Sequence, residues 1–255
     1  TLPVYEFTTR ICENTPLTVT RLVTEEVSCL HDYSLSTTQM KNVERAELII
    51  ISGAGLEDFT ADILQGRDPV LDSSEGISLL ECHEEHDHQH GADSHIWLSP
   101  RNAKTMATNI CNGLTDQYPQ YETVFAANLD TLVQKLDALQ AYGEAQLSQL
   151  SCRELITFHD GFGYLADAFD LQIVAAIEEE SGSEASAKDL IEMIHLVEEH
   201  NMPAVFTEVN GSVSAASVIQ AEIGTGIYAL DMAMGGSDYF QAMRANIDNL
   251  KEALQ

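Results

Sequence analysis

Short apolar runs alternate with amphipathic stretches along the first part of the chain. The apolar runs at residues 17–23 and 47–52 predict strands, and residues 37–46, which lie between them, have the pattern of a helix. A further amphipathic stretch over residues 56–64 predicts another helix. This order of strand, helix and strand is typical of βαβ units and therefore of an α/β fold.

Two glycines, Gly53 and Gly55, follow the second predicted strand directly. They favour a tight strand-to-helix turn, because glycine tolerates backbone conformations that other residues avoid. A dinucleotide-binding GxGxxG motif would need a third glycine near position 58, where Asp58 stands. The sequence therefore does not predict nucleotide binding.

A single long amphipathic helix is predicted near the middle of the chain. Residues 121–150 contain no proline and only one glycine, and leucines recur every three or four positions, at Leu129, Leu132, Leu136 and Leu139. A second α/β series follows, with strands expected at 154–158, 171–177, 204–208 and 227–230 and helices at 186–200 and 239–254. The simplest fold has two α/β lobes, each with a mainly parallel sheet, joined by the long helix. We place the N-terminal lobe at 1–118, the linking helix at 119–150 and the C-terminal lobe at 151–255, with any ligand in the interlobe cleft.

The charge of the chain is strongly negative. Twelve Lys and Arg residues stand against 41 Asp and Glu residues, which gives a formal net charge of −29. A nucleic acid is therefore not expected as a partner. An acidic surface attracts cations without selecting among them, so the charge permits metal binding but does not predict it.

The cysteines and the apolar runs say little about the compartment. Five scattered cysteines contain no CxxC pair, and a disulfide between Cys29 and Cys82 and buried free thiols are both compatible with their spacing. No run of about 18 apolar residues and no N-terminal leader occur in this sequence, so we expect a soluble chain.

The most biased segment is rich in histidine and acid. Residues 83–90 hold four histidines and three carboxylates and have no apolar periodicity. We expect a solvated loop that collects divalent cations weakly and is not itself a rigid single-metal site.

Three further histidines lie at expected strand ends or loops. His31 and His95 stand in loop segments, and His159 ends the strand predicted at 154–158. Neutral imidazole suits Zn²⁺, so convergence of the three would make a zinc site, although each alone is more often structural. Asp231, directly after the last predicted strand, is the best-placed fourth ligand, and Glu208, which ends another strand, competes with it.

Other chemistry finds no support in the sequence. His195 and His200 lie on a predicted helix, five residues apart, and we interpret them as structural. No HExxH, GxSxG or P-loop motif occurs, so the common hydrolase and NTPase signatures are missing from this sequence.

The motifs together resemble the zinc-type cluster A-I substrate-binding proteins of ABC metal importers. The resemblance runs over nearly the whole chain and rests on these segments: Cys29-Leu-His31-Asp-Tyr-Ser-Leu-Ser, Ile51-Ser-Gly-Ala-Gly-Leu-Glu57, the 83–90 loop, Asp93-Ser-His95-Ile-Trp-Leu-Ser-Pro100, Phe158-His159-Asp-Gly-Phe-Gly-Tyr164-Leu, Leu230-Asp231 with the following glycine pair, and the C-terminal helix. The family implies two lobes joined by a rigid helix, with the metal between them.

The resemblance also implies the site and the role. His31, His95 and His159 would bind one transported Zn²⁺, with Asp231 or water as the fourth ligand. Manganese-type members resemble this chain but have a carboxylate at the position of His159, so zinc is favoured over Mn²⁺. Glu208 would then orient a ligand, and Asp32 and Asp160 are further candidates for that role.

The resemblance implies an extracytoplasmic protein that is not an enzyme. It would be periplasmic or lipid-anchored, act as a monomer and deliver zinc to a membrane permease. Family members begin with a strand before the segment that starts here at Thr1, so the first strand of the N-terminal lobe is expected to be missing. Three alternatives stay open: a manganese- or iron-binding member of the same family, a zinc hydrolase with Glu208 as its base, and an adhesin of the same fold.

Overall fold

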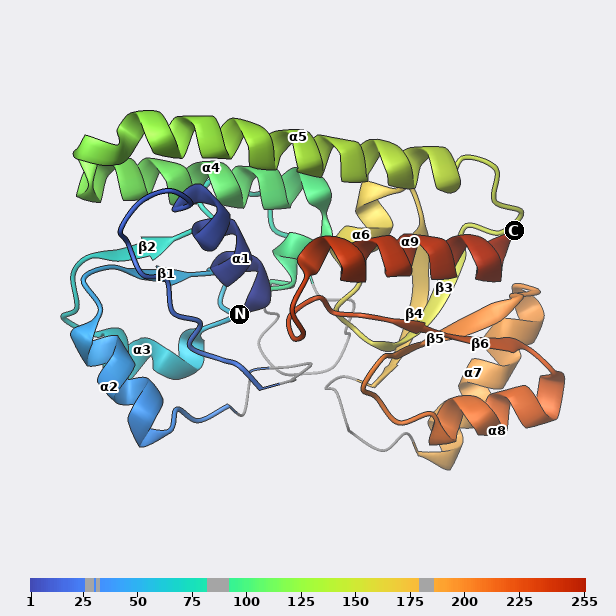
Figure 1. The fold of residues 1–255 in the computed structure, drawn as a ribbon. Helices are drawn as coiled ribbons and strands as arrows, with labels where there is room; N and C mark the ends of the chain where they lie inside the picture. Colours follow the sequence, from blue (N-terminus) through green and yellow to red (C-terminus); the bar gives the residue numbers. More distant parts are fainter. Residues whose placement is uncertain (26–29, 31–32, 82–91, 179–185) are drawn as a thin grey trace.

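The structure is a computed structural model and describes residues 1–25, 30, 33–81, 92–178 and 186–255 (Figure 1). It is an α/β protein in which the strands of both sheets run parallel. The α/β class predicted from the alternation of apolar and amphipathic segments is therefore confirmed.

The N-terminal sheet is small. Its two strands, β1 and β2, pair in parallel with Ile50 opposite Leu71. The elements of this part of the chain are α1 (Leu2–Ile11), α2 (Thr37–Arg45), β1 (Ile49–Ile51), α3 (Ala61–Leu64), β2 (Val70–Asp72) and α4 (Pro100–Gln117). The predicted helix at 37–46 and strand at 47–52 are confirmed, whereas the helix expected at 56–64 is only a 3-10 turn, Asp58–Thr60, followed by the short α3.

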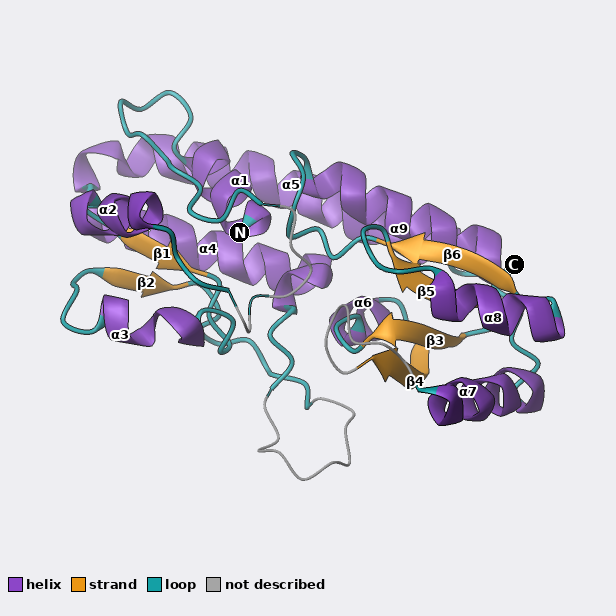
Figure 2. Ribbon diagram, turned by 90° about the horizontal axis from the view of Figure 1, so that it is seen from below, coloured by secondary structure: helices purple, strands orange, loops and turns teal. Residues whose placement is uncertain are grey.

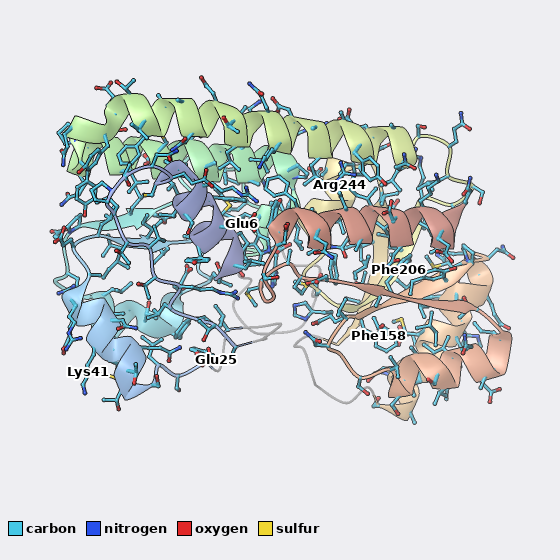
Figure 3. All side chains as sticks on the ribbon, in the orientation of Figure 1. Glu6, Glu25, Lys41, Phe158, Phe206 and Arg244 are labelled. Carbon is cyan, nitrogen blue, oxygen red and sulfur yellow. The ribbon has the colours of Figure 1, made fainter. Side chains whose placement is uncertain are left out.

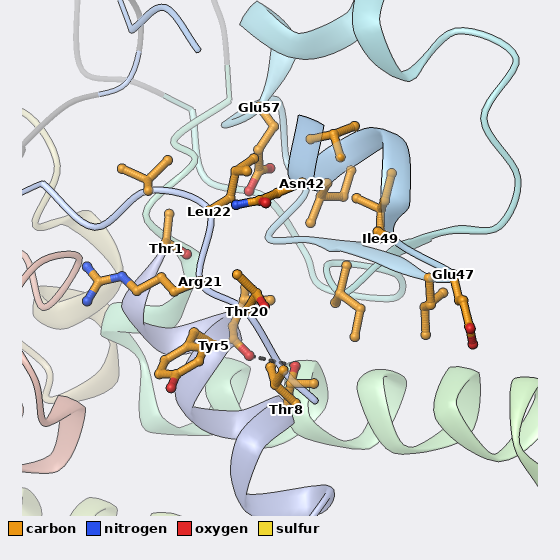
Figure 4. Close-up of a pocket in the computed structure, with 18 of the residues that line it drawn as sticks. Thr1, Tyr5, Thr8, Thr20, Arg21, Leu22, Asn42, Glu47, Ile49 and Glu57 are labelled. Atoms are coloured by element: carbon orange, nitrogen blue, oxygen red, sulfur yellow. Dashed lines mark hydrogen bonds between the residues drawn. The ribbon is translucent and has the colours of Figure 1, made fainter. Parts of the chain in front are cut away.

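The strand predicted at residues 17–23 is wrong. These residues have no regular secondary structure. A strand needs a neighbour for its backbone hydrogen bonds, and this segment instead lines a cavity of about 580 Å³ that is also lined by β1. Figure 4 shows residues of α1, of this segment and of β1 around the cavity. The segment and β1 therefore line the same cavity and form no ladder with each other.

Helix α4 was not predicted. It begins after Ser99, whose hydroxyl accepts a hydrogen bond from the Asn102 amide, and Pro100 occupies the first turn. Its buried face combines large apolar residues with small ones: Met106, Ile110 and Leu114 with Ala103, Ala107 and Cys111. This spacing of three and four is helical, but alanine and cysteine give it little contrast in the sequence.

The long helix α5 (Glu122–Gln146) is confirmed and contacts elements from both ends of the chain. It packs along α4 and α1 and also along α9 (Tyr239–Leu254), as Figure 1 shows. Close approach is needed near its end, because a Cβ on Gly143 would lie 2.2 Å from the Phe169 ring. The division of the chain at 119–150 stays a prediction.

The C-terminal sheet has the order β4-β3-β5-β6. Its elements are β3 (Glu154–His159), α6 (Gly163–Ala168), β4 (Gln172–Glu178), α7 (Ala187–Glu199), β5 (Ala204–Glu208), α8 (Ser214–Ile223) and β6 (Gly226–Leu230), before α9. The strands and helices predicted for this part are confirmed.

The two faces of this sheet bury different residues. Phe158 packs with α7 and α8 residues such as Met193, whereas Phe206 belongs to the main core with α9 (Figure 3). Figure 2 shows the strands with α7 and α8 beside them. No helix among the described residues is long and apolar enough to cross a membrane.

Candidate metal centre

The register of the C-terminal sheet brings His159 next to Glu208. Strands β3 and β5 pair in parallel with Thr157 opposite Phe206, so the positions two residues further on, His159 and Glu208, also come side by side. Side chains alternate between the faces of a strand, and both therefore share the face of Phe206, towards the main core. The carboxyl edge of a parallel sheet is where α/β proteins bind ligands.

The His159–Glu208 contact is buried. The side chains are 4% and 6% exposed, and Glu208 Oε1 lies 3.6 Å from His159 Nδ1. This distance is longer than a direct hydrogen bond. A carboxylate on the Nδ1 side stabilises a proton on that nitrogen and so favours the tautomer in which Nε2 carries the lone pair.

His95 has a carboxylate in the same relation to its ring. Asp93 Oδ1 accepts a hydrogen bond from the His95 amide at 2.8 Å and lies 2.9 Å from His95 Nδ1. The Asp93 backbone is fixed in turn, because the Tyr164 hydroxyl donates to its carbonyl at 3.1 Å. Asp93 and His95 are both buried. Both histidines thus have a carboxylate on the Nδ1 side.

The two imidazole rings lie close together. The centroids of His95 and His159 are 5.3 Å apart, and the ring planes are nearly perpendicular, at 88°. His95 comes from the loop before a 3-10 turn (Ile96–Leu98), and His159 from the end of β3. Two of the three predicted histidine ligands therefore converge.

Gly161 lies against the Nε2 side of His159. A Cβ at this position would lie 2.7 Å from His159 Cδ2 and 2.9 Å from Nε2, and also 2.7 Å from Met232 Cε. A β-carbon essentially never approaches other atoms so closely. Glycine is therefore required here to leave the ring in its place.

Asp231 is held mainly through its backbone. Its amide donates to Asn246 Oδ1 and its carbonyl accepts from Asn246 Nδ2, both at 2.7 Å. Its Oδ1 accepts a hydrogen bond from the Ala233 amide at 2.8 Å. Strand alternation puts Leu230, opposite Glu208, on the His159 face, so Asp231 lies one residue beyond it in the loop.

Within the described ranges, no group of three or more His, Cys, Asp or Glu side chains is arranged to hold a metal ion. His31 and Asp32 lie outside these ranges, as does the predicted collecting loop at 83–90. His31 and Asp231 therefore stay predicted ligands. The role suggested for Asp160 also stays a prediction.

Other candidate groups lie away from this pair. His200 ends α7 and its Nδ1 lies 2.8 Å from Glu154 Oε2, at the opposite end of β3 from His159. His195 is exposed on α7. Among the described cysteines, Cys12, Cys111 and Cys152 are free thiols, whereas Cys29 and Cys82 lie outside the described part.

The sequence interpretation missed Asp93 and Gly161. An acid two residues before His95 is a recognisable signal, because aspartate side chains commonly accept hydrogen bonds from backbone amides two residues on. Gly161 follows His159 by the same spacing. Its role depends on the packing of the ring, which has no local signature.

Comparison with known proteins matches nearly the whole chain to one family. Residues 1–253 match the sequence model of a family described as "Zinc-uptake complex component A periplasmic". The high-affinity zinc uptake system protein ZnuA of Bacillus subtilis is 29% identical over 273 residues, which cover 99% of this chain and 85% of that protein. The zinc-binding protein AdcA of Streptococcus pyogenes is 27% identical, and the match covers 98% of this chain but 54% of AdcA. This chain thus spans about half the length of AdcA.

Solved structures give the same result. A crystal structure of ZnuA has a TM-score of 0.85 and 27% identity, and the match covers 100% of this chain and 97% of that one. The two folds therefore agree over their whole length.

Proposed function

Because this chain belongs to the zinc-uptake complex component A family, we propose that it captures Zn²⁺ outside the cytoplasm and delivers it to the permease of an ABC importer. Proteins of this family bind a substrate for transport and are not enzymes. The permease partner, a monomeric state and periplasmic or lipid-anchored placement are parts of this proposal.

We assign His31, His95 and His159 as zinc ligands. Zn–N bonds of about 2.0–2.1 Å put a bound imidazole centroid about 3.2 Å from the metal, and a tetrahedral angle then separates two centroids by about 5.2 Å. The observed separation of His95 and His159 is 5.3 Å. This spacing fits two ligands of one tetrahedral metal, and together with the family match it supports the proposal.

The carboxylates behind the two rings support the assignment. Asp93 and Glu208 lie on the Nδ1 sides of the two rings, so we assign the Nε2 atoms to the metal. Such carboxylate–histidine pairs orient the ring and raise its basicity. Both carboxylates are buried. The +2 charge of zinc would therefore offset two buried negative charges.

We assign Asp231 as the fourth ligand. It lies one residue beyond the sheet edge that carries Glu208 and Leu230, and it is half-buried. Its Oδ1 accepts the Ala233 amide, so Oδ2 is the atom assigned to the metal. Glu208, the competing candidate, approaches His159 on the Nδ1 side and so fits an orienting role better.

Zinc titration of the metal-free protein tests the proposal. We expect one zinc ion per chain, bound tightly, and a loss of tight binding in His31→Ala, His95→Ala and His159→Ala. His195→Ala is the matched control, because His195 is exposed on α7. Unchanged zinc affinity in all three variants would overturn the assignment.

The same titration with Mn²⁺ tests the alternative cargo. A site with three imidazoles favours Zn²⁺, whereas carboxylate oxygens favour Mn²⁺. We therefore expect the protein to prefer zinc and His159→Glu to shift the preference towards manganese. Tighter binding of Mn²⁺ than of Zn²⁺ by the unaltered protein would favour the manganese alternative.

A further inference from the structure

Trp97, two residues after His95, connects distant parts of the chain. It is the one tryptophan of the sequence and is fully buried. Its indole Nε1 donates a hydrogen bond to the Met232 carbonyl at 2.7 Å, and its own carbonyl accepts one from the Tyr239 hydroxyl at 2.7 Å. The residues on both sides of this contact are buried, so the bonds are shielded from water.

The loop that receives this hydrogen bond is residues 231–238, here called the β6–α9 loop. Residues near the start of the chain donate hydrogen bonds to later residues of this loop. Arg21 donates to the Met234 carbonyl at 2.9 Å and to the Gly236 carbonyl at 2.8 Å, and the Leu2 amide donates to Met234 at 3.1 Å. The loop begins in the C-terminal sheet but is tied to the N-terminal part of the protein.

The Trp97–Met232 bond lies beside the candidate metal centre. The Trp97 ring is 5.4 Å from the His95 ring, and Met232 directly follows Asp231 in the chain. The Met232 side chain and the His159 ring both border the space where a Cβ of Gly161 would lie. One hydrogen bond thus joins the segment that carries His95 to the segment that carries Asp231 and neighbours His159.

We propose that Trp97 is a positioning residue that sets the spacing of the metal site. The inference rests on the zinc site proposed above. Trp97 itself does not bind the metal. Its N–H group holds the Met232 carbonyl, and thereby keeps Asp231 and His159 at a fixed distance from His95. Small Zn²⁺ depends most on this spacing, and a larger cation such as Cd²⁺ depends on it less.

Because the chain has one tryptophan, the indole N–H donor of Trp97 can be replaced without a change at any other position. Biosynthetic replacement with benzothienylalanine puts sulfur in place of the indole N–H and keeps the ring, and here it changes position 97 alone. We expect the Kd for zinc to rise about tenfold or more, and the Kd for cadmium to rise less. Competition with a chelator of known zinc affinity measures both.

Two other variants separate positioning from general stability. Phe125→Leu alters a buried aromatic in α5 that belongs to the same core, and should lower the Tm without changing the zinc Kd. Arg21→Met removes two other bonds to the β6–α9 loop from a partly exposed residue. Arg21→Met should raise the zinc Kd by a smaller factor than the tryptophan analogue does. It tests the hold on the same loop if the analogue protein does not fold.

The outcomes distinguish this inference from the proposed function. If the tryptophan protein binds zinc and the analogue protein binds it equally well, the role of Trp97 is overturned and the zinc site stands. Equal weakening by Phe125→Leu would also overturn it. If the tryptophan protein does not bind zinc, both proposals fail.

Discussion

Glu208 Oε1 lies 3.6 Å from His159 Nδ1 at the carboxyl ends of two adjacent strands. The relation follows from the register of β3 and β5, which places the two side chains on one face of the sheet. The backbone positions of the two residues are therefore fixed relative to each other by the pairing of two central strands. Glu208 is therefore built into the sheet as the group behind His159.

Substitution of Glu208 tests this role. We expect Glu208→Gln to raise the zinc Kd about 10–100-fold, because an amide orients the imidazole less strongly and does not raise its basicity. Competition with a chelator measures the change. Glu199→Gln, on the exposed end of α7, is the control. A zinc Kd in Glu208→Gln equal to that of the control would show that the carboxylate does not act on His159.

Gly161→Ala should disturb the site with little effect on the fold. The new methyl group would overlap the His159 ring and the end of the Met232 side chain, and both must move off their preferred positions. We expect the zinc Kd to rise about tenfold, which corresponds to about 1.4 kcal/mol.

Gly226→Ala serves as the control for Gly161→Ala. Its methyl group would contact the Tyr228 side chain at 3.1 Å, at the other end of β6 from Asp231. Zinc titration and thermal unfolding of both variants give the comparison. Equal zinc affinities in the two variants would contradict the steric role of Gly161.

The buried Cys12 thiol should make the folded protein less stable at high pH. Burial, with a further contribution from nearby Cys111, raises the Cys12 pKa from an ordinary value of 9.0 to about 11. The unfolded chain therefore loses this proton at lower pH than the folded protein, and ionisation favours unfolding as the pH rises from about 9 to about 11. Below pH 9 the stabilisation from the neutral thiol is fully present.

Denaturant unfolding at pH 8 and pH 10.5 measures this effect. The original protein should lose more stability between the two pH values than Cys12→Ala does, because the variant has no thiol to ionise. Cys152→Ala, in which a half-buried thiol is removed, is the control. The same pH dependence in Cys12→Ala and the original protein would refute the prediction.

Deletion of residues 83–90 should impair the capture of zinc from dilute solution without weakening tight binding at the main site. These residues lie outside the described part of the structure, and the prediction rests on their four histidines and three carboxylates. We expect the deletion variant to bind zinc from dilute solution more slowly, while the Kd of the main site changes little. Calorimetric titration that shows complete loss of tight binding in the deletion variant would be the contrary result.

Strong local patterns in the sequence were sufficient to predict most of the C-terminal part. The buried strand β5 begins with three apolar residues, Ala204 to Phe206, and the start of α7 is marked by Ser186, whose side chain and that of Asp189 form a capping box. Such signals can be read from the local sequence alone. The strand predicted at 17–23 failed because a strand depends on its neighbour as well as on its own residues.

The candidate site was predictable only in part. His95 and His159 could be named from their motifs, but their approach depends on the way the loop before Ile96 packs against the end of β3. The carboxylates beside the two rings also differ in how far they can be predicted. Asp93 is two residues from His95 in the sequence, whereas Glu208 lies beside His159 only because of the strand register. Register is set by the whole sheet and cannot be read from either strand alone.

Helix α5 packs against α4 and α1 as well as against α9. His95 lies shortly before α4, and Asp231 lies in the loop shortly before α9. One helix therefore braces both of the segments that carry these two candidate ligands, although the segments are far apart in the sequence.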